Sequence, residues 1–100
     1  MTYQALETLV ELWADDKGIL TKATPKAQAE KTLEEVHELI DAIESGNILE
    51  IIDALGDILV TIIIQAKMQG LSLEDCLESA YDVISKRTGK MINGQFVKDK

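Results

Sequence analysis

Apolar residues recur along most of the chain at the spacing of an amphipathic α-helix, and few glycines or prolines interrupt the pattern. The first predicted helix runs from about Tyr3 to Asp15, and a looser segment from Lys17 to Ala23 follows it. The apolar positions of this helix fall on one face: Leu6, Leu9, Val10 and Trp13. We therefore expect the chain to begin with a helix that buries one side only.

A second helix is predicted to begin at Thr24-Pro25 and to end near Ser45. Threonine is a favoured N-cap, and proline fits the first helical position because the amide there has no partner within the helix. Gly46 and Asn47 supply a short turn, and two helices joined by so short a turn pack antiparallel. The second and third helices are therefore expected to lie side by side.

The third predicted helix, from about Ile48 to Met68, is apolar on almost every side, because twelve of the seventeen residues from Ile48 to Ile64 are apolar. Its length approaches that of a membrane span. However, three carboxylates lie within it, and each would cost several kcal/mol at the centre of a bilayer. We therefore predict the buried centre of a helical bundle, whose remaining apolar surface a second subunit covers.

A fourth helix is predicted to start at a capping box formed by Ser72 and Asp75, and to end near residues 87–89. The tail that follows contains an Asn93-Gly94 turn and a short predicted strand around Phe96-Val97. The pattern thus predicts an all-α, four-helix, bundle-like subunit with a short C-terminal tail, which assembles into a helical oligomer.

Composition narrows the class of protein further. One hundred residues, of which 46% are hydrophobic, form a single domain over residues 1–100 with a thin core. A net charge of -8 argues against duplex nucleic acid and anionic membranes as partners. The single cysteine, Cys76, cannot form an internal disulfide, and the N-terminus lacks an export signal. We therefore expect a cytoplasmic protein whose thin core is completed by a partner subunit.

Six of the acidic residues form two stripes, one on each of the two central helices. On the second helix three glutamates fall within about 100° of arc, and on the third helix three acids fall within about 60°. The six residues are Glu34, Glu35, Glu38, Glu50, Asp53 and Asp57. Crowded carboxylates repel one another unless a proton or a cation intervenes, and an oxygen-only ligand set favours Mg²⁺, with Mn²⁺ as a substitute. Taken alone, the first stripe is also compatible with a solvated helix face.

Two further features offer contacts to a nucleotide. Trp13 is either a core residue or an aromatic platform on which a base stacks beside the acidic site. Positive charge clusters only near the C-terminus, and the residues concerned are Lys86, Arg87, Lys90 and Lys98. These cations either complement the C-terminal dipole of the fourth helix or bind phosphate.

The order of these motifs resembles the MazG-like all-α nucleotide pyrophosphohydrolases. The resemblance rests on the EExxE sequence of residues 34–38, a turn, and an apolar helix that carries Gly56-Asp57. It extends to Thr24-Pro25 and to the Asn93-Gly94 tail, which is similar to the small stand-alone members found in phage and mobile elements. The family has an ExxD motif in the third helix. If Asp57 is its aspartate, Ala54 occupies the place of its glutamate, and Glu50 or Asp53 on the same face could supply the missing ligand.

The resemblance implies an Mg²⁺-dependent enzyme that hydrolyses nucleoside triphosphates to the monophosphate and pyrophosphate, as in nucleotide-pool house-cleaning. It implies a homodimer or a homotetramer built from dimers. On this basis we expect Glu35 or Glu38 to accept the proton of the attacking water. The resemblance also places further substrate-binding residues at Gln28, Lys31 and Tyr81, the last of which stands where many relatives carry asparagine. Two alternatives stay open: a phosphoribosyl-ATP or dUTP pyrophosphohydrolase, and a non-catalytic oligomerisation or regulatory module with a degenerate site.

Overall fold

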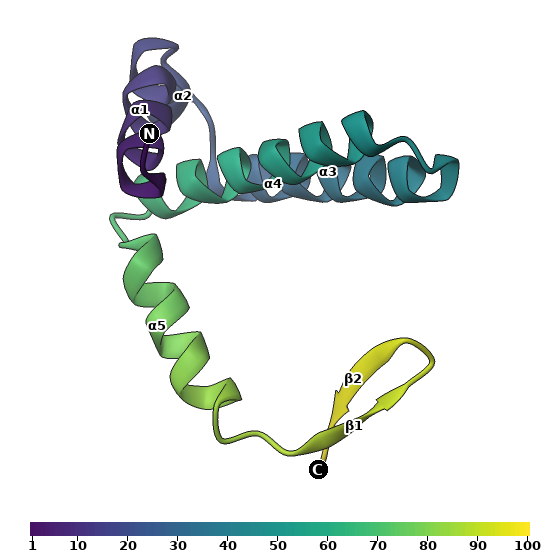
Figure 1. Cartoon of the computed structure of the whole chain (residues 1–100). Helices are drawn as coiled ribbons and strands as arrows, with labels where there is room; N and C mark the ends of the chain where they lie inside the picture. The colour runs from purple at the N-terminus through teal and green to yellow at the C-terminus, as the bar shows by residue number, and fades with distance from the viewer.

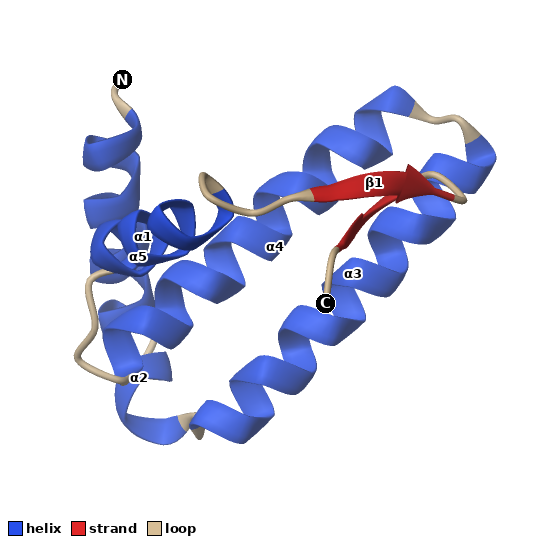
Figure 2. Ribbon diagram, turned by 90° about the horizontal axis from the view of Figure 1, so that it is seen from below, coloured by secondary structure: helices blue, strands red, loops and turns tan.

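Two long antiparallel helices form the centre of the structure, a computed structural model that describes all residues from Met1 to Lys100. Helices α3 (Pro25–Ser45) and α4 (Ile48–Met68) lie side by side along their length (Figure 2). The Thr24 hydroxyl accepts a hydrogen bond of 3.1 Å from the amide of Ala27, which caps α3 as the sequence predicts. The pair carries the acidic residues of both predicted stripes.

A two-residue turn holds this pair together at one end. Gly46 ends α3 with φ of 70°, in the left-handed region that glycine adopts without strain. The side chain of Asn47 then accepts hydrogen bonds from the amides of Leu49 and Glu50, at 3.1 and 3.3 Å, and so caps α4. Because both caps lie within the turn, the chain reverses abruptly and the two helices start in contact.

The N-terminal segment packs across the far end of α4. Helix α1 (Tyr3–Asp16) is capped by Thr2, and after a tight turn a single helical turn follows, α2 (Ile19–Lys22). Both helices contact α4 (Figure 1). Ala14 on α1 is completely buried. This packing places one face of α1 beside the middle of α4.

The C-terminal segment leads away from the central pair (Figure 1). Helix α5 (Leu73–Ile84) is followed by an antiparallel hairpin of β1 (Gly89–Ile92) and β2 (Gln95–Lys98). The Asn93-Gly94 turn has positive φ at both residues, as a two-residue hairpin requires. No residue of α5 is buried, so this segment forms an arm that the rest of the chain does not cover. We refer to α5 and the hairpin together as the C-terminal arm.

The predicted helices at 25–45 and 48–68 are confirmed, as is the mostly helical character of the chain. The prediction of four helices was wrong, because residues 19–22 form a short fifth helix. The last helix ends at Ile84 instead of near Arg87, and the predicted short strand is one half of a hairpin. The bundle-like packing was also not found for α5, because only the start of this helix lies near α1 and α4 and none of its residues is buried.

Few residues are buried within one chain. Only nine of the hundred are, and most of the apolar ones are small, including Ala14, Ala42 and Ala54. Three of the nine are polar: Gln28, Glu35 and Thr61. In contrast, twenty-three large apolar side chains are exposed. No helix combines the length and the apolar character that a bilayer crossing requires. The buried polar groups lie between α3 and α4, where they matter for the site described next.

Candidate functional site

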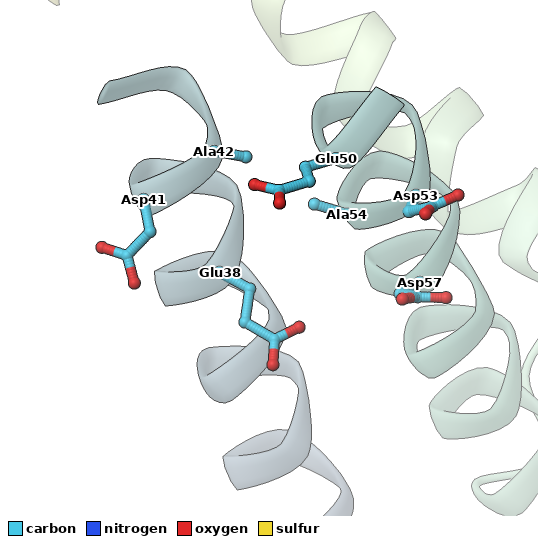
Figure 3. Close-up of a pocket in the computed structure, with 7 residues that line it drawn as sticks. All are labelled: Glu38, Asp41, Ala42, Glu50, Asp53, Ala54 and Asp57. Atoms are coloured by element: carbon cyan, nitrogen blue, oxygen red, sulfur yellow. The ribbon is translucent and has the colours of Figure 1, made fainter. Parts of the chain in front are cut away.

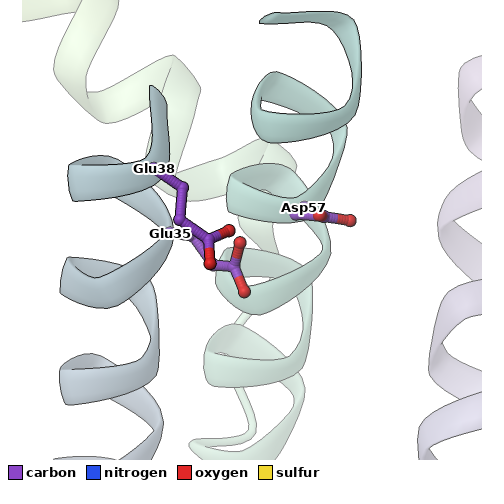
Figure 4. A group of neighbouring side chains, drawn as sticks. All are labelled: Glu35, Glu38 and Asp57. Atoms are coloured by element: carbon purple, nitrogen blue, oxygen red, sulfur yellow. The ribbon is translucent and has the colours of Figure 1, made fainter. Parts of the chain in front are cut away.

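The most deeply placed acidic side chain of the molecule is Glu35. It is 7% exposed and projects from α3 toward α4 (Figure 4). Its Oε1 atom lies 3.2 Å from Nζ of Lys31, which also lies 3.5 Å from Oε1 of Glu34. The other oxygen, Oε2, is buried and has no hydrogen-bond partner. A buried carboxylate oxygen without a donor is costly, so this atom is suited to accept a proton or a cation.

Two more carboxylates converge on the same point. Glu38 follows Glu35 on the next turn of α3, and Asp57 comes from α4 (Figure 4). One carboxylate oxygen from each of the three residues lies within 4.8 Å of the others. The sequence predicted that the two helices would bring their acidic faces together, and these three are the acids that the structure gathers most closely.

The closeness of Glu35 affects the protonation of Glu38. A hydrogen bond with Glu35, followed by the charge of that carboxylate, raises the pKa of Glu38 above its usual value. Conversely, the hydrogen bond to Glu35 and the charge of Glu34 raise the pKa of Lys31. Glu38 therefore retains its proton more readily than an isolated carboxyl would, and Lys31 is the one lysine paired with the acids beside it.

An open cleft of about 380 Å³ continues from this cluster along the two helices (Figure 3). Its walls are acidic, and two alanines face it, one from each helix: Glu38, Asp41, Ala42, Glu50, Asp53, Ala54 and Asp57 line it. Small side chains at Ala42 and Ala54 let the helices meet closely while leaving space above them. The cleft is thus a shallow groove with five carboxylates and no lysine or arginine in its lining.

The other predicted metal ligands differ in where they lie. Glu50 and Asp53 line the cleft, and Glu50 extends toward α3 beside Ala42 (Figure 3). Glu34 is exposed and pairs with Lys31. Ala54 is 4% exposed and sits between Glu50 and Asp57 on the same wall. Ala54 therefore has a carboxylate residue, Glu50 or Asp57, on either side of it along the cleft wall.

Asp41 lines the cleft and was missed by the sequence analysis. It lies three residues after Glu38, so it falls on the same face of α3. That spacing could have identified it. The EExxE pattern ends at Glu38, so it does not include the next turn of the helix, where Asp41 lies.

A second cavity, of about 340 Å³, adjoins the acidic residues and is mostly apolar. It lies between α1 and α4, and its lining residues are Leu9, Val10, Trp13, Asp57 and Val60. Trp13 is 49% exposed, so its side chain is not buried in the core of the single chain. Because Asp57 belongs both to this lining and to the carboxylate cluster, an aromatic surface and the acidic site lie next to each other.

The remaining predicted substrate contacts are not gathered at the site within one chain. Gln28 is buried between the central helices, where its side-chain amide donates a 3.2 Å hydrogen bond to the carbonyl of Thr61. The others lie on the C-terminal arm or just before its hairpin: Tyr81, Lys86, Arg87, Lys90 and Lys98. Of these, Lys86 forms an exposed ion pair of 3.4 Å with Asp82. The positive charge of the arm is therefore separate from the acidic cleft.

The donor set fits a hard divalent cation. All three converging groups offer carboxylate oxygen, which Mg²⁺ and Mn²⁺ prefer, and one of those oxygens is buried without a partner. No cysteine or histidine belongs to the cluster, which argues against a soft-metal site. The acidic groove between two antiparallel helices thus makes this mainly helical chain a candidate divalent-cation-binding protein.

Comparison with known families agrees with this description. Residues 23–92 match the family model of the MazG nucleotide pyrophosphohydrolase domain, and the chain belongs to this family. The match includes α3, α4, α5 and the first strand of the hairpin. The resemblance inferred from the EExxE motif and the acidic apolar helix is therefore confirmed.

One curated relative is an uncharacterised 18.2 kDa protein from the rep–hol intergenic region of Haemophilus phage HP1. It is 34% identical to this chain over 64 residues, which are 64% of this chain and 39% of the relative. The aligned part thus spans well under half of that phage protein. No solved structure matches the chain.

Proposed function

We propose that this protein is an Mg²⁺-dependent nucleoside triphosphate pyrophosphohydrolase that converts NTPs or dNTPs to the monophosphate and pyrophosphate, with a role in nucleotide-pool house-cleaning. The observation that carries the proposal is the buried, unpartnered Oε2 of Glu35 within a cluster of three convergent carboxylates. Membership of the family supports the class of reaction, and the acidic groove supports the need for a cation.

The proposed cation ligands are the three clustered acids, with Glu34, Glu50 and Asp53 as further oxygen donors. When bound, Mg²⁺, or Mn²⁺ in its place, would neutralise triphosphate charge and make a nearby water more acidic. Glu50 and Asp53 would supply the carboxylate that Ala54 lacks, because they line the same wall of the cleft.

The protein's own groups would handle the proton and the base. Glu35 or Glu38 accepts a proton from the water whose oxygen attacks the α-phosphorus, and the bond from that phosphorus to the α–β bridging oxygen breaks. Pyrophosphate leaves with the electron pair of that bond. Trp13 stacks on the base, because its half-exposed ring lines the apolar cavity that includes Asp57.

The leaving pyrophosphate needs positive charge, which the acidic groove does not provide. Lys31 lies beside Glu35 and is one source. The basic arm is the other: Arg87 and Lys90, assisted by Lys86, Lys98 and Tyr81, contact phosphate once a second subunit packs against the first. Gln28 belongs to this substrate set only as a support for α3, because its amide is engaged with Thr61.

Release of pyrophosphate from a panel of NTPs and dNTPs, with and without Mg²⁺, tests the proposal. We expect Mg²⁺-dependent release, and we expect Glu38→Gln and Asp57→Asn to lower the rate by about 10²–10⁴-fold. Glu44→Gln is the matched control, because Glu44 is an exposed acid of α3 outside the cleft. Failure to release pyrophosphate from any nucleotide would overturn the proposal. Including phosphoribosyl-ATP and dUTP in the panel separates the alternative substrates.

A non-catalytic oligomerisation module is the competing function, favoured by Ala54 and by the exposed apolar side chains. On that hypothesis the carboxylates only repel one another. Mg²⁺ would then leave the melting temperature unchanged, while Glu38→Gln and Asp57→Asn would raise it. On the enzyme hypothesis Mg²⁺ raises the melting temperature of the parent protein, and both substitutions abolish that protection.

A further inference from the structure

A pair of hydroxyl groups joins the two central helices next to the carboxylate cluster. Oγ1 of Thr32 on α3 lies 2.8 Å from Oγ1 of Thr61 on α4, and Thr61 is 5% exposed. This is the only hydrogen bond between side chains that connects two helices of the protein. Two hydrogen bonds from a side chain to a backbone carbonyl also join α3 and α4, toward the start of α3: Gln28 donates to Thr61 at 3.2 Å and Gln65 donates to Pro25 at 2.8 Å.

The direction of the hydroxyl pair follows from counting protons, because each hydroxyl has one. Thr61 donates its proton to the carbonyl of Ile58 at 2.7 Å, so its oxygen is free to accept. Thr32 therefore donates to Thr61. Its alternative acceptor, the carbonyl of Gln28 at 3.2 Å, is within its own helix and more distant. The donors of both hydroxyl groups that link the two helices are thus satisfied.

The position of this pair relates directly to the acidic cluster. Thr32 precedes Glu35 by three residues, and Thr61 follows Asp57 by four, so each threonine lies one helical turn from an acid. Because the helices are antiparallel, the hydroxyl pair and the acidic pair are successive contacts along one interface. Ala42 and Ala54 continue the same series on the far side of the acids.

Apolar packing alone does not select this alignment. Helix α4 carries isoleucine, leucine or valine on nearly every face, so a rotation or slip against α3 would still bury apolar surface. A slip of one turn would move Asp57 by about 5.4 Å relative to Glu35 and Glu38. The three ligand atoms now lie within 4.8 Å of one another, so such a slip would separate them. A buried polar pair is a recognised way to specify register in helical packing.

We propose that the Thr32–Thr61 hydroxyl pair fixes the register of α3 against α4 and thereby positions Glu35 and Glu38 against Asp57. Both threonines are positioning residues, because they act through the carboxylates. The inference rests on the proposed function only in taking the carboxylate cluster as a cation site. The register that the pair imposes can be measured without any cation or nucleotide.

The first experiment measures Mg²⁺ affinity from the rise in melting temperature with Mg²⁺ concentration. Thr61→Val keeps the shape of the side chain and removes the hydroxyl. Thr32 then turns its proton to the carbonyl of Gln28, so no buried donor is stranded. We expect Thr61→Val and Thr32→Val to weaken Mg²⁺ binding by about 10–100-fold, as loss of a supporting group around a metal site does. The double variant should be no worse than either single one.

Two controls separate positioning from simple stabilisation. Thr61→Ser keeps the hydroxyl and should retain the parent's Mg²⁺ affinity. Thr8→Val removes a hydroxyl that bonds only to the carbonyl of Gln4 within α1, so it should leave Mg²⁺ affinity unchanged. A merely structural role would lower the melting temperature of the metal-free protein and leave Mg²⁺ affinity as it was.

The second experiment reads the register directly. Spin labels at Glu44→Cys and Lys67→Cys, in a Cys76→Ser background, mark exposed positions near the C-terminal ends of the antiparallel helices. The distance between them therefore runs along the helix axes and changes with any slip. Labelled protein is diluted with unlabelled protein so that only distances within one chain contribute. We expect one narrow distance distribution in the parent and in Thr61→Ser, and a broadened or double distribution in Thr61→Val.

The outcomes distinguish this inference from the proposed function. A parent that binds Mg²⁺ but releases no pyrophosphate overturns the function and leaves the register proposal standing if Thr61→Val weakens Mg²⁺ binding. If the parent protein does not bind Mg²⁺, the spin-label distances alone test whether the hydroxyl pair fixes the register of α3 against α4. An unchanged distance distribution in both Thr61→Val and Thr32→Val overturns the proposal, as does unchanged Mg²⁺ affinity in those variants of a Mg²⁺-binding parent.

Discussion

Glu35 and Glu38 show how the environment of a carboxylate sets what it can bind. One oxygen of Glu35 is paired with Lys31, and the other is buried without a donor. The carboxyl of Glu38 can form a hydrogen bond with that of Glu35 only while one of them carries a proton, and this bond, followed by the charge of Glu35, raises the pKa of Glu38. A proton and a divalent cation are therefore alternative occupants of the same small space, and they compete.

This competition predicts a pH dependence of stability. Because the pKa of Glu38 is raised in the folded state, folded protein holds a proton that the unfolded chain has already lost as pH rises above the usual value of 4.5. Stability without metal should therefore fall, through this group, as pH rises from 4.5 to the raised pKa. In Glu38→Gln this loss is absent. The difference in melting temperature between Glu38→Gln and the parent should widen over that window and then level off.

Without Mg²⁺ we expect Glu38→Gln to melt at a higher temperature than the parent, and with Mg²⁺ we expect the parent to melt at the higher temperature. At a free concentration of 100 times its Kd, a ligand stabilises the folded state by about 2.7 kcal/mol. We expect this protection in the parent to grow as pH rises from 4.5 to the raised pKa of Glu38. Above that pKa Glu38 has already lost its proton, so the cation no longer has to displace it. Glu38→Gln should show little protection at any pH. A difference between the two proteins that does not change with pH would contradict the assignment.

At the scale of the elements, the contribution of the turn between α3 and α4 to stability can be measured separately from side-chain packing. Gly46 has φ of 70° and nothing within 4 Å of the place a Cβ would occupy, so Gly46→Ala introduces backbone strain alone. We expect a loss of about 1–2 kcal/mol in the free energy of unfolding. Gly56 lies inside α4 with equally open surroundings, so Gly56→Ala should stabilise the protein by about 0.5–1 kcal/mol.

Urea unfolding measures the change in the free energy of unfolding in each variant. The two variants are comparable because each adds a single methyl group. The opposite signs are the informative result, because they report backbone conformation rather than packing. If both substitutions destabilise the protein, the methyl at position 56 must meet another subunit. If neither does, the turn does not hold the left-handed conformation in solution.

The elements themselves were largely predictable from the sequence because their signals are local. Thr24-Pro25, the Gly46-Asn47 turn and the capping box at Ser72 each satisfy backbone groups at a helix end, and each occurs where predicted. Similarly, the acidic faces met because helical period and a short turn determine which side chains face each other. This reasoning does not require knowledge of the rest of the fold.

What could not be predicted depends on contacts between distant residues. The hydrogen bond from the amide of Gln28 to the carbonyl of Thr61 joins residues that are 33 positions apart, and no local pattern predicts it. The early end of α5 at Ile84 reflects the start of the hairpin, whose pairing involves residues beyond the helix. Nor did the sequence indicate that the basic arm would lie apart from the acidic groove.

At the scale of the whole molecule, the single chain leaves much of its apolar surface uncovered. Twenty-three large apolar side chains are exposed, and the arm is among the least covered parts. A helix as short as α5 is only marginally stable in water without a packing partner. These features support the proposal that the chain self-associates and that the arm takes part in the contact.

Self-association predicts that stability depends on protein concentration. The melting temperature should fall on dilution, and light scattering should give a mass greater than that of one chain. Leu77 on α5 is 70% exposed, and Leu77→Asp should reduce the mass toward that of the monomer. Ser79→Asp adds the same charge to the same helix at a polar position and serves as the control. A monomer at all concentrations would remove the basis for a basic arm supplied by a second subunit.

The shortness of the turn between α3 and α4 also determines the order of events during folding. The contacts beside the turn join residues that are close in the sequence, so they close only a short loop and form quickly. Meeting another chain is slower and depends on concentration. We therefore expect the helical hairpin to form before any contact with a second chain, so that a newly synthesised chain gathers its carboxylates on its own.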